Sequence, residues 1–273
     1  MSTGLPPRFR QRFLARDMLL GSFIKTPTTH SIEILGGIGF DFVVIDEEHA
    51  PFDRVTIDNG LLAARAVGTA GIVRVAEPTA SKLLAVLDDG ATGVLVPHVS
   101  DVEKARAIVS ACRYKGGSRG FSNSPRAGNY GAVGMWPHVE EQDGSVTVIA
   151  MIEDPEALDV IDDIVAVDGL DGVFVGRGDL SVAMGAQSQA SPEVHAATEK
   201  IAKAAIAAGK PVCVMVGSIE ETTAFRPLGV TSFIVSSDQG LMRQAASKVV
   251  TDFRDIADSQ AEGPDGGATR PAY

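Results

Sequence analysis

TVIAMIEDPEALDVIDDIVAVDGLDGVFVG, residues 147–176, contains two short apolar runs separated by a segment with the punctuation of a helix. The runs, 147–153 and 172–176, are continuous and do not alternate with polar residues, which is typical of parallel strands covered by helices. Between them Asp154 precedes Pro155, and proline is favoured at the first position of a helix. The segment therefore predicts one β-α-β unit.

The same unit recurs along the chain. Apolar runs predict further strands at 20–25, 40–46, 71–77, 93–98, 211–216 and 232–237, and helical patterns cover 100–114, 154–167, 195–210 and 239–260. Eight β-α units in roughly 250 residues are what an α/β fold of the (β/α)8 type, the TIM barrel, requires, and we predict that fold. The alternative, a doubly wound open sheet, normally carries a glycine-rich phosphate-binding motif after an early strand, and this sequence has none.

The domain organisation is predicted from the absence of any composition shift between units. We expect 1–260 to form a single barrel domain that begins with an N-terminal lead-in helix, and 261–273 to form a flexible tail. The arginines of the lead-in segment also resemble a transit peptide, but the segment runs directly into the first strand.

Residues 115–146, which contain many Gly, Ser and Pro residues, are expected to form a long loop. Ser100 followed by Glu103 predicts a capping box at a helix start.

Composition and charge exclude several classes of partner. The chain has 273 residues, 45% of them hydrophobic and 22% charged, as in ordinary globular proteins. Its formal net charge of −11 repels nucleic acid and anionic lipid, so we expect neither as a partner. No apolar run is long enough to span a bilayer. Cys112 and Cys213 stand alone in the sequence and offer no disulfide framework, which favours a cytoplasmic location.

Two carboxylates follow neighbouring strands at the ends where barrel enzymes carry their catalytic residues. Glu153 ends the fifth predicted strand and Asp179 follows the sixth. Such a pair suits a hard divalent cation, Mg²⁺ or Mn²⁺, and leaves coordination positions open for water and substrate. The competing interpretation is that Asp154 or Asp179 only caps the following helix.

Arg74 and His49 are the candidate basic groups. Arg74 lies within the apolar strand segment VRV, where a guanidinium is costly unless an anion pairs with it. That anion could be a substrate, or Arg74 could form a structural ion pair with Asp46 or Glu48. His49 could transfer protons near neutral pH, or it could be a capping or buried histidine.

Two further signals are weaker. The segment GRGDLS, 176–181, could offer backbone N–H groups to a carboxylate or phosphate. Lys25 at the end of the first strand could form a Schiff base with a carbonyl substrate. Strand 6, the usual place for such a lysine, has Arg177 instead, so Schiff-base chemistry ranks low.

A family resemblance joins these residues. The sequence resembles the HpcH/HpaI family of metal-dependent pyruvate aldolases, roughly from Gly21 to Ala257. The segments that carry the resemblance are GFDFVVIDEEHAPFD (39–53), VRV (73–75), LLAVLDDGATGVLVPHV (83–99), RYKGGSRGFS (113–122), MIEDPEALDVIDDIVAVDGLDGVFVGRGDLSVAMG (151–185) and GKPV (209–212).

The resemblance assigns roles residue by residue. The family's metal ligands match Glu153 and Asp179. The catalytic arginine of the family matches Arg74, and its catalytic histidine matches His49. Asp88 matches the acidic partner of that histidine, and Asp46 matches a further acid of the site. The backbone N–H groups that hold the pyruvate carboxylate match those of Gly178 and Asp179, and Gly176 and Met151 match positions beside the substrate.

The function implied by the resemblance is a class II aldolase. Such an enzyme catalyses reversible aldol cleavage or addition between pyruvate, or a close 2-keto acid, and an aldehyde, through a metal-stabilised enolate. The expected cofactor is Mg²⁺ or Mn²⁺, with Co²⁺ or Zn²⁺ as further options. The expected assembly is a homohexamer whose C-terminal helices, here 239–260, are exchanged between subunits.

This chain departs from the family pattern at three positions. It has Glu47 where members often have Gly, Arg177 where a Gly-Pro-x-Asp-Leu pattern has Pro, and Met151 where some members have Gln. Glu47 and Arg177 are expected to add charge beside the barrel mouth. Two other functions remain open: an acyl-CoA lyase of the citrate lyase beta or malyl-CoA lyase type, which would need a basic surface for the nucleotide phosphates, and a non-catalytic metabolite-binding barrel.

Overall fold

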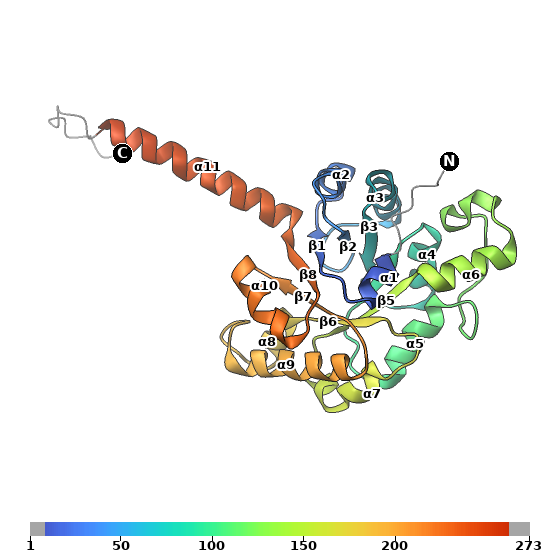
Figure 1. Ribbon diagram of the computed structural model, residues 1–273. Helices are drawn as coiled ribbons and strands as arrows, with labels where there is room; N and C mark the ends of the chain where they lie inside the picture. Colours follow the sequence, from blue (N-terminus) through green and yellow to red (C-terminus); the bar gives the residue numbers. More distant parts are fainter. Residues whose placement is uncertain (1–8, 262–273) are drawn as a thin grey trace.

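A closed barrel of eight parallel strands forms the centre of the computed structural model, which describes residues 9–261 (Figure 1). The strands neighbour one another in sequence order, and β8 pairs with β1 to close the sheet. The predicted TIM barrel is therefore confirmed. The strands are β1 Leu19–Ile24, β2 Phe42–Asp46, β3 Ala70–Arg74, β4 Gly93–Val96, β5 Thr147–Ile152, β6 Gly172–Val175, β7 Val212–Val216 and β8 Ser232–Ser237.

Helices follow the strands and cover the outside of the barrel. They are α2 Thr29–Gly37, α3 Arg54–Val67, α4 Ala80–Asp88, α5 Val102–Cys112, the 3-10 helix η2 Pro155–Val160 with α7 Ile161–Val165, α8 Arg177–Ala183, α9 Pro192–Ala207, and α10 Ile219–Phe225 with η3 Arg226–Leu228. Local sequence sets their ends. Asp53 and Thr56 form a reciprocal capping box at the start of α3, and Gly68 ends it with a φ of 74°.

The strand residues divide into two apolar layers. Side chains that point into the barrel, among them Phe23, Phe42 and Phe174, pack with one another, whereas the opposite face of each strand packs against the helices. Helix α1, Phe9–Leu14, closes the end where the strands begin, because its Phe9 and Phe13 join the interior cluster. Only the end where the strands finish is left for a site.

Two predicted helix starts differ in detail. The cap of α5 is Asp101 and not Ser100, because the Asp101 carboxylate accepts the N–H of Lys104 at 2.8 Å. The predicted helix 154–167 begins as the 3-10 helix η2, and in the described structure the Asp154 side chain makes no capping hydrogen bond to it.

The prediction of a loop at 115–146 is wrong in its second half. The segment contains the 3-10 helix η1, Arg126–Gly131, and helix α6, Met135–Ser145. Pro137 falls in the first turn of α6, where a missing N–H costs little. The Asp143 carboxylate anchors α6 by accepting the N–H groups of Tyr114 at 2.8 Å and Lys115 at 2.9 Å. Proline and glycine in the sequence concealed this helix.

Helix α11, Asp238–Ala261, runs away from the barrel instead of folding back onto it (Figure 1). It is too polar to cross a membrane, and no other helix among residues 9–261 is both long and apolar enough. The division into one domain and a tail stays a prediction, and the predicted tail lies outside the described residues except for Ala261.

Candidate active site

Polar side chains from several strands meet at the carboxyl end of the barrel. They are Lys25 after β1, Asp46, Glu48 and His49 at the end of β2, Arg74 at the end of β3, His98 after β4, Glu153 after β5 and Asp179 after β6. This is the end of a barrel where function is expected.

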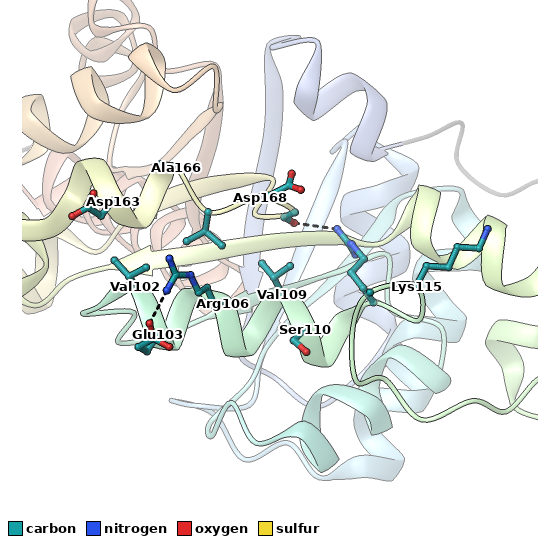
Figure 2. A pocket seen from close by; sticks show the side chains of 13 residues that line it. Val102, Glu103, Arg106, Val109, Ser110, Lys115, Asp163, Ala166 and Asp168 are labelled. Carbon is teal, nitrogen blue, oxygen red and sulfur yellow. Dashed lines mark hydrogen bonds and ion pairs between the residues drawn. The ribbon is translucent and has the colours of Figure 1, made fainter.

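A groove of about 800 Å³ lies elsewhere, on the outside of the barrel between α5 and α7. Figure 2 shows Val102, Val109 and Ala166 lining it, with Arg106 paired to Glu103 at 2.7 Å. This groove lies on the helical face of the barrel and not at the carboxyl end of the strands, where barrel enzymes carry their sites.

Arg74 and Asp46 form a buried bidentate ion pair. Nε and Nη2 of Arg74 each lie 2.8 Å from a carboxylate oxygen of Asp46, which is 0% exposed. Burial alone would raise the pKa of Asp46, but the hydrogen bonds and charge of Arg74 outweigh it and lower the pKa. Lys25 Nζ lies 3.1 Å from the same carboxylate. This ion pair gives Lys25 a structural role beside Asp46, which is consistent with a low rank for Schiff-base chemistry.

The rest of the Arg74 guanidinium faces the site. Nη1 lies 3.1 Å from Oε2 of Glu48 and 4.0 Å from the sulfur of Met151, and the guanidinium carbon lies 4.9 Å from the ring centre of Phe23. Both ion pairs considered from the sequence, with Asp46 and with Glu48, are therefore present. These ion pairs hold the positively charged guanidinium in a fixed position at the carboxyl end of the barrel.

Glu153 is a carboxylate in a buried position, 2% exposed. Its Oε1 accepts the backbone N–H of His98 at 2.9 Å. A Cβ on Gly176 would lie 2.6 Å from Oε2, so only glycine at that position leaves this oxygen room. Burial, together with the nearby charges of Asp179 and Glu48, raises the pKa of Glu153 to about 7.

The second carboxylate, Asp179, is part of the first turn of α8. Within the described residues neither Asp179 nor Asp154 makes a side-chain capping bond, so the capping interpretation receives no support. Gly178 precedes Asp179 and leaves space near its backbone, since a Cβ there would meet only the end of Gln189 at 3.6 Å.

This donor set fits a divalent cation. The two carboxylates supply hard oxygen ligands, and burial is the main cause of the raised pKa of Glu153. The His98 ring is a neighbouring basic group, with Nδ1 3.5 Å from Oε1 of Glu153. No cluster of three or more His, Cys, Asp or Glu side chains with a metal-binding arrangement occurs in residues 9–261. A cation between Glu153 and Asp179 would therefore take its other ligands from water or substrate.

His98 was given no role from the sequence, yet it lies at the centre of the mouth. Its backbone has a φ of 53°, in the left-handed region that non-glycine residues seldom adopt. Nδ1 lies 3.1 Å from Asp154, and Nε2 lies 3.8 Å from Glu48. Burial lowers the pKa of His98, but the hydrogen bond with Asp154 and the charges of Glu153, Asp154 and Glu48 outweigh it and raise the pKa. The one sequence signal for a role of His98 was the acid Asp154, which directly follows Glu153.

His49 and Asp88 are not brought together. His49 is an exposed histidine whose Nε2 lies 3.9 Å from Glu48. Asp88 ends α4, where it pairs with Arg119 at 3.3 Å, and burial raises its pKa. No contact joins Asp88 and His49 within the described part of one chain. The assignment of Asp88 as partner of His49 therefore stays a prediction, for which one described chain supplies no contact.

Glu47 and Arg177 do not add free charge beside the mouth, contrary to expectation. Glu47 accepts the ammonium of Lys82 at 2.5 Å and the N–H of Ala76 at 3.2 Å. Arg177 is 5% exposed and pairs with Glu221 at 2.6 Å. Both side chains join neighbouring segments of the fold, so their charges are neutralised internally.

Comparison with known proteins points to one family. The family described as HpcH/HpaI aldolase/citrate lyase matches residues 19–245. A curated relative, the 5-keto-4-deoxy-D-glucarate aldolase of Enterobacter sp. (strain 638), is 35% identical over 253 residues, which cover 91% of this chain and 97% of the relative. The solved structure of citrate synthase SbnG has 32% identity and a TM-score of 0.82, covering 92% of this chain and 99% of that one. An HpcH/HpaI aldolase/citrate lyase family protein from Burkholderia cenocepacia J2315 has 26% identity and a TM-score of 0.85, covering 90% and 98%.

Proposed function

The chain belongs to the HpcH/HpaI aldolase/citrate lyase family and is an aldolase, a carbon–carbon lyase. From this premise we propose that the site at its barrel mouth cleaves and forms the carbon–carbon bond between a 2-keto acid and an aldehyde. The observation that carries the proposal is the arrangement of Glu153 and Asp179, two neighbouring carboxylates at the same end of the barrel as the fixed guanidinium of Arg74. One side of this site offers oxygen ligands, and the other offers permanent positive charge.

Glu153 and Asp179 would hold the divalent cation on which the family's aldolases generally depend. When bound, that cation supplies a Lewis acid for the keto oxygen and carboxylate of the substrate. We propose Mg²⁺ or Mn²⁺, because both protein ligands are hard oxygens; Co²⁺ and Zn²⁺ are the alternatives. The metal identity is testable by loading the metal-free protein with each ion in turn.

Arg74 would stabilise the negative charge that develops on the substrate's keto oxygen as the methyl group loses a proton. Asp46 and Lys25 form the support of that guanidinium, since Asp46 binds it through two hydrogen bonds and Lys25 balances the charge of Asp46. The backbone N–H groups of Gly178 and Asp179 would hold the substrate carboxylate, with Gly176 and Met151 bounding the same side.

His49 is the proposed proton carrier. Its side chain is 55% exposed, so it can exchange protons with solvent and with a substrate oxygen at the mouth. In the cleavage direction it would take the proton from the 4-hydroxyl group as the bond between the third and fourth carbons breaks. In the addition direction it would return a proton to the oxygen of the former aldehyde.

The substrate class is proposed from the curated relatives, which are named for 5-keto-4-deoxy-D-glucarate. We propose hydroxylated 2-keto acids of that kind as substrates. The test is pyruvate release from such an acid, followed with a coupled dehydrogenase, in the presence of Mg²⁺ or Mn²⁺ and after chelation. Metal-dependent release supports the proposal, and its absence with every hydroxylated 2-keto acid tried would refute it.

A thioester-dependent activity is the second candidate, because one solved relative at 32% identity is named a citrate synthase. The same assay with acetyl-CoA and a 2-keto acid separates the two functions. Release of free CoA without any pyruvate release would favour the second candidate. Pyruvate binding without either reaction would indicate a metabolite-binding barrel.

The assembly is proposed from α11. Its Val249, Phe253 and Ile256 are at least 60% exposed, and this helix extends beyond the barrel (Figure 1). An apolar stripe of this kind is stabilised when another surface covers it. We propose that a second copy of the chain covers it, in a homo-oligomer that the family resemblance suggests is a hexamer.

A reducing, cytoplasmic location is proposed from the cysteines. Cys112 and Cys213 are both buried free thiols, and burial raises the pKa of Cys112 to about 12 and that of Cys213 further still. Neither thiol is placed to form a disulfide or to react.

A further inference from the structure

Asp179 lies in the first turn of α8, and glycines stand on both sides of the first helical residue. Gly176 follows β6 and caps the helix, Arg177 is the first residue of α8, and Gly178 comes directly before Asp179. Glycine loses more conformational freedom on folding than any other residue, so a turn with two glycines is less stable on its own than one built from other residues. This turn must nevertheless hold the Asp179 carboxylate close to Glu153.

The side chain between the glycines provides an anchor. Arg177 reaches across to β7 and α10, where Nη1 lies 2.6 Å from Oε1 of Glu221 and Nη2 donates to the carbonyl of Met215 at 2.7 Å. Its guanidinium carbon lies 4.8 Å from the ring centre of Phe225. An arginine held in this way by a carboxylate, a carbonyl and an aromatic ring is immobile.

Glu221, which binds Arg177, is itself held in place by a second contact. The second carboxylate oxygen of Glu221 accepts the N–H of Gly217 at 2.7 Å, so Glu221 joins the end of β7 to α10 and then holds Arg177. Arg177 is also the first residue of α8, and its carbonyl accepts the hydroxyl of Ser181 at 2.6 Å. The first turn of α8 is therefore fastened through the side chain that stands between its two glycines.

We propose that Arg177 is a positioning residue that fixes Asp179 for metal binding by fastening the first turn of α8 to β7 and α10; the inference rests on the proposed function of Asp179 as a metal ligand. In the family pattern a proline occupies the place of Arg177, and proline fixes φ near −65° through its ring. In this chain the tertiary contacts of Arg177 do what that ring would do.

The proposal separates Arg177 from a residue that only stabilises the fold. Loss of a purely structural contact lowers the unfolding temperature but leaves the metal affinity of the folded protein unchanged. Loss of a positioning contact weakens metal binding in protein that is still folded, and outer contacts of metal ligands typically contribute about 10–100-fold in affinity.

The experiment compares Arg177→Ala with Arg177→Pro. Mn²⁺ affinity is measured by electron paramagnetic resonance on the metal-free full chain, at a temperature where circular dichroism shows every variant folded. Arg177→Ala should bind Mn²⁺ about 10-fold or more weakly than the natural chain. Arg177→Pro should recover most of that loss, since proline is well tolerated at the first helical position and restricts this turn directly. Lys203→Ala, which breaks an exposed ion pair with Glu199 on α9, is the matched control and should bind normally.

A second readout does not use metal. Hydrogen exchange of the Leu180 amide, which donates to the Gly176 carbonyl at 3.1 Å and closes this turn, should be faster in Arg177→Ala than in the natural chain and slower again in Arg177→Pro. If Arg177→Ala does not fold, Glu221→Gln supplies the comparison, because it weakens the same anchor while Met215 still holds the guanidinium.

Normal Mn²⁺ affinity and normal amide exchange in Arg177→Ala would overturn the positioning role. Asp179→Asn distinguishes this failure from failure of the proposed function. If Asp179→Asn binds Mn²⁺ as well as the natural chain does, the metal site itself is wrong. If Asp179→Asn loses Mn²⁺ while Arg177→Ala keeps it, only the role of Arg177 fails.

Discussion

The backbone N–H of His98 donates a 2.9 Å hydrogen bond to Oε1 of Glu153, and His98 adopts a left-handed φ of 53° to do so. The left-handed conformation is unfavourable for any residue with a Cβ. The surrounding contacts hold it in place, since the Lys104 ammonium binds the His98 carbonyl at 2.5 Å and Asp154 binds the ring. The strained residue thus orients one oxygen of the proposed metal ligand.

Replacement of His98 separates the backbone from the ring. His98→Gly removes the ring and relieves the conformational cost, whereas His98→Ala removes the ring and keeps that cost. We expect His98→Ala to be less stable than His98→Gly by about 1 kcal/mol in urea unfolding. Equal stability of the two variants would mean that the left-handed backbone is not maintained in solution.

The raised pKa of Glu153 predicts how stability depends on pH in the metal-free protein. The unfolded chain releases this proton near pH 4.5, but the folded chain keeps it until about pH 7. Between these values the folded state binds more protons, so the free energy of unfolding falls as pH rises, by on the order of 3 kcal/mol in total.

Urea unfolding at intervals from pH 4.5 to pH 8 measures this fall. Glu153→Gln should flatten the curve, whereas Glu156→Gln, at a nearby exposed position, should leave it unchanged. A curve of the same slope in Glu153→Gln would assign the effect to another group.

Arg74 should be required for turnover. Removal of one group that stabilises developing charge typically costs on the order of 10²–10³ in kcat. We expect Arg74→Ala to lose at least that much in pyruvate release. Arg74→Lys keeps the charge but cannot reproduce the bidentate contact with Asp46, so its activity should lie between that of the natural chain and that of Arg74→Ala.

Stability must be measured beside turnover in these variants, because Arg74→Ala leaves the carboxylate of Asp46 with fewer partners in a buried site. Loss of one member of a buried pair costs about 3–5 kcal/mol. Near-normal turnover of folded Arg74→Ala would remove this residue from the mechanism.

The exposed face of α11 should mediate assembly. Phe253→Glu places a charge where an apolar partner surface is proposed, so it should lower the molar mass measured by sedimentation equilibrium. Lys248→Ala breaks an exposed ion pair with Asp252 on the same helix and serves as the control. If Phe253→Glu assembles as the natural chain does, α11 does not form the interface.

The barrel could be predicted because each strand is a continuous apolar run and most strand residues are buried on both faces. The barrel architecture determines where strand-end residues lie, so Glu153 and Arg74 could be named from the sequence. Features that depend on three-dimensional placement could not be predicted. The pairing of Asp88 with Arg119 and the direction of the Arg177 side chain towards Glu221 both depend on residues that lie far apart in the sequence.

Two features left little trace in the sequence. The role of His98 depends on a backbone angle and on its backbone contact with Glu153, which have no sequence signature, so the acid that follows Glu153 was its only signal. Helix α6 lies in a segment whose glycine and proline content is typical of loops, although its proline occupies the one turn where a helix accepts it.

The most direct test of the central claim is the exchange of pyruvate methyl protons in deuterated water, followed by nuclear magnetic resonance. The natural chain should exchange them in the presence of Mg²⁺ or Mn²⁺, and exchange should stop after chelation and in Asp179→Asn. Undiminished exchange in the chelated protein, or in Asp179→Asn, would contradict a cation held by Glu153 and Asp179.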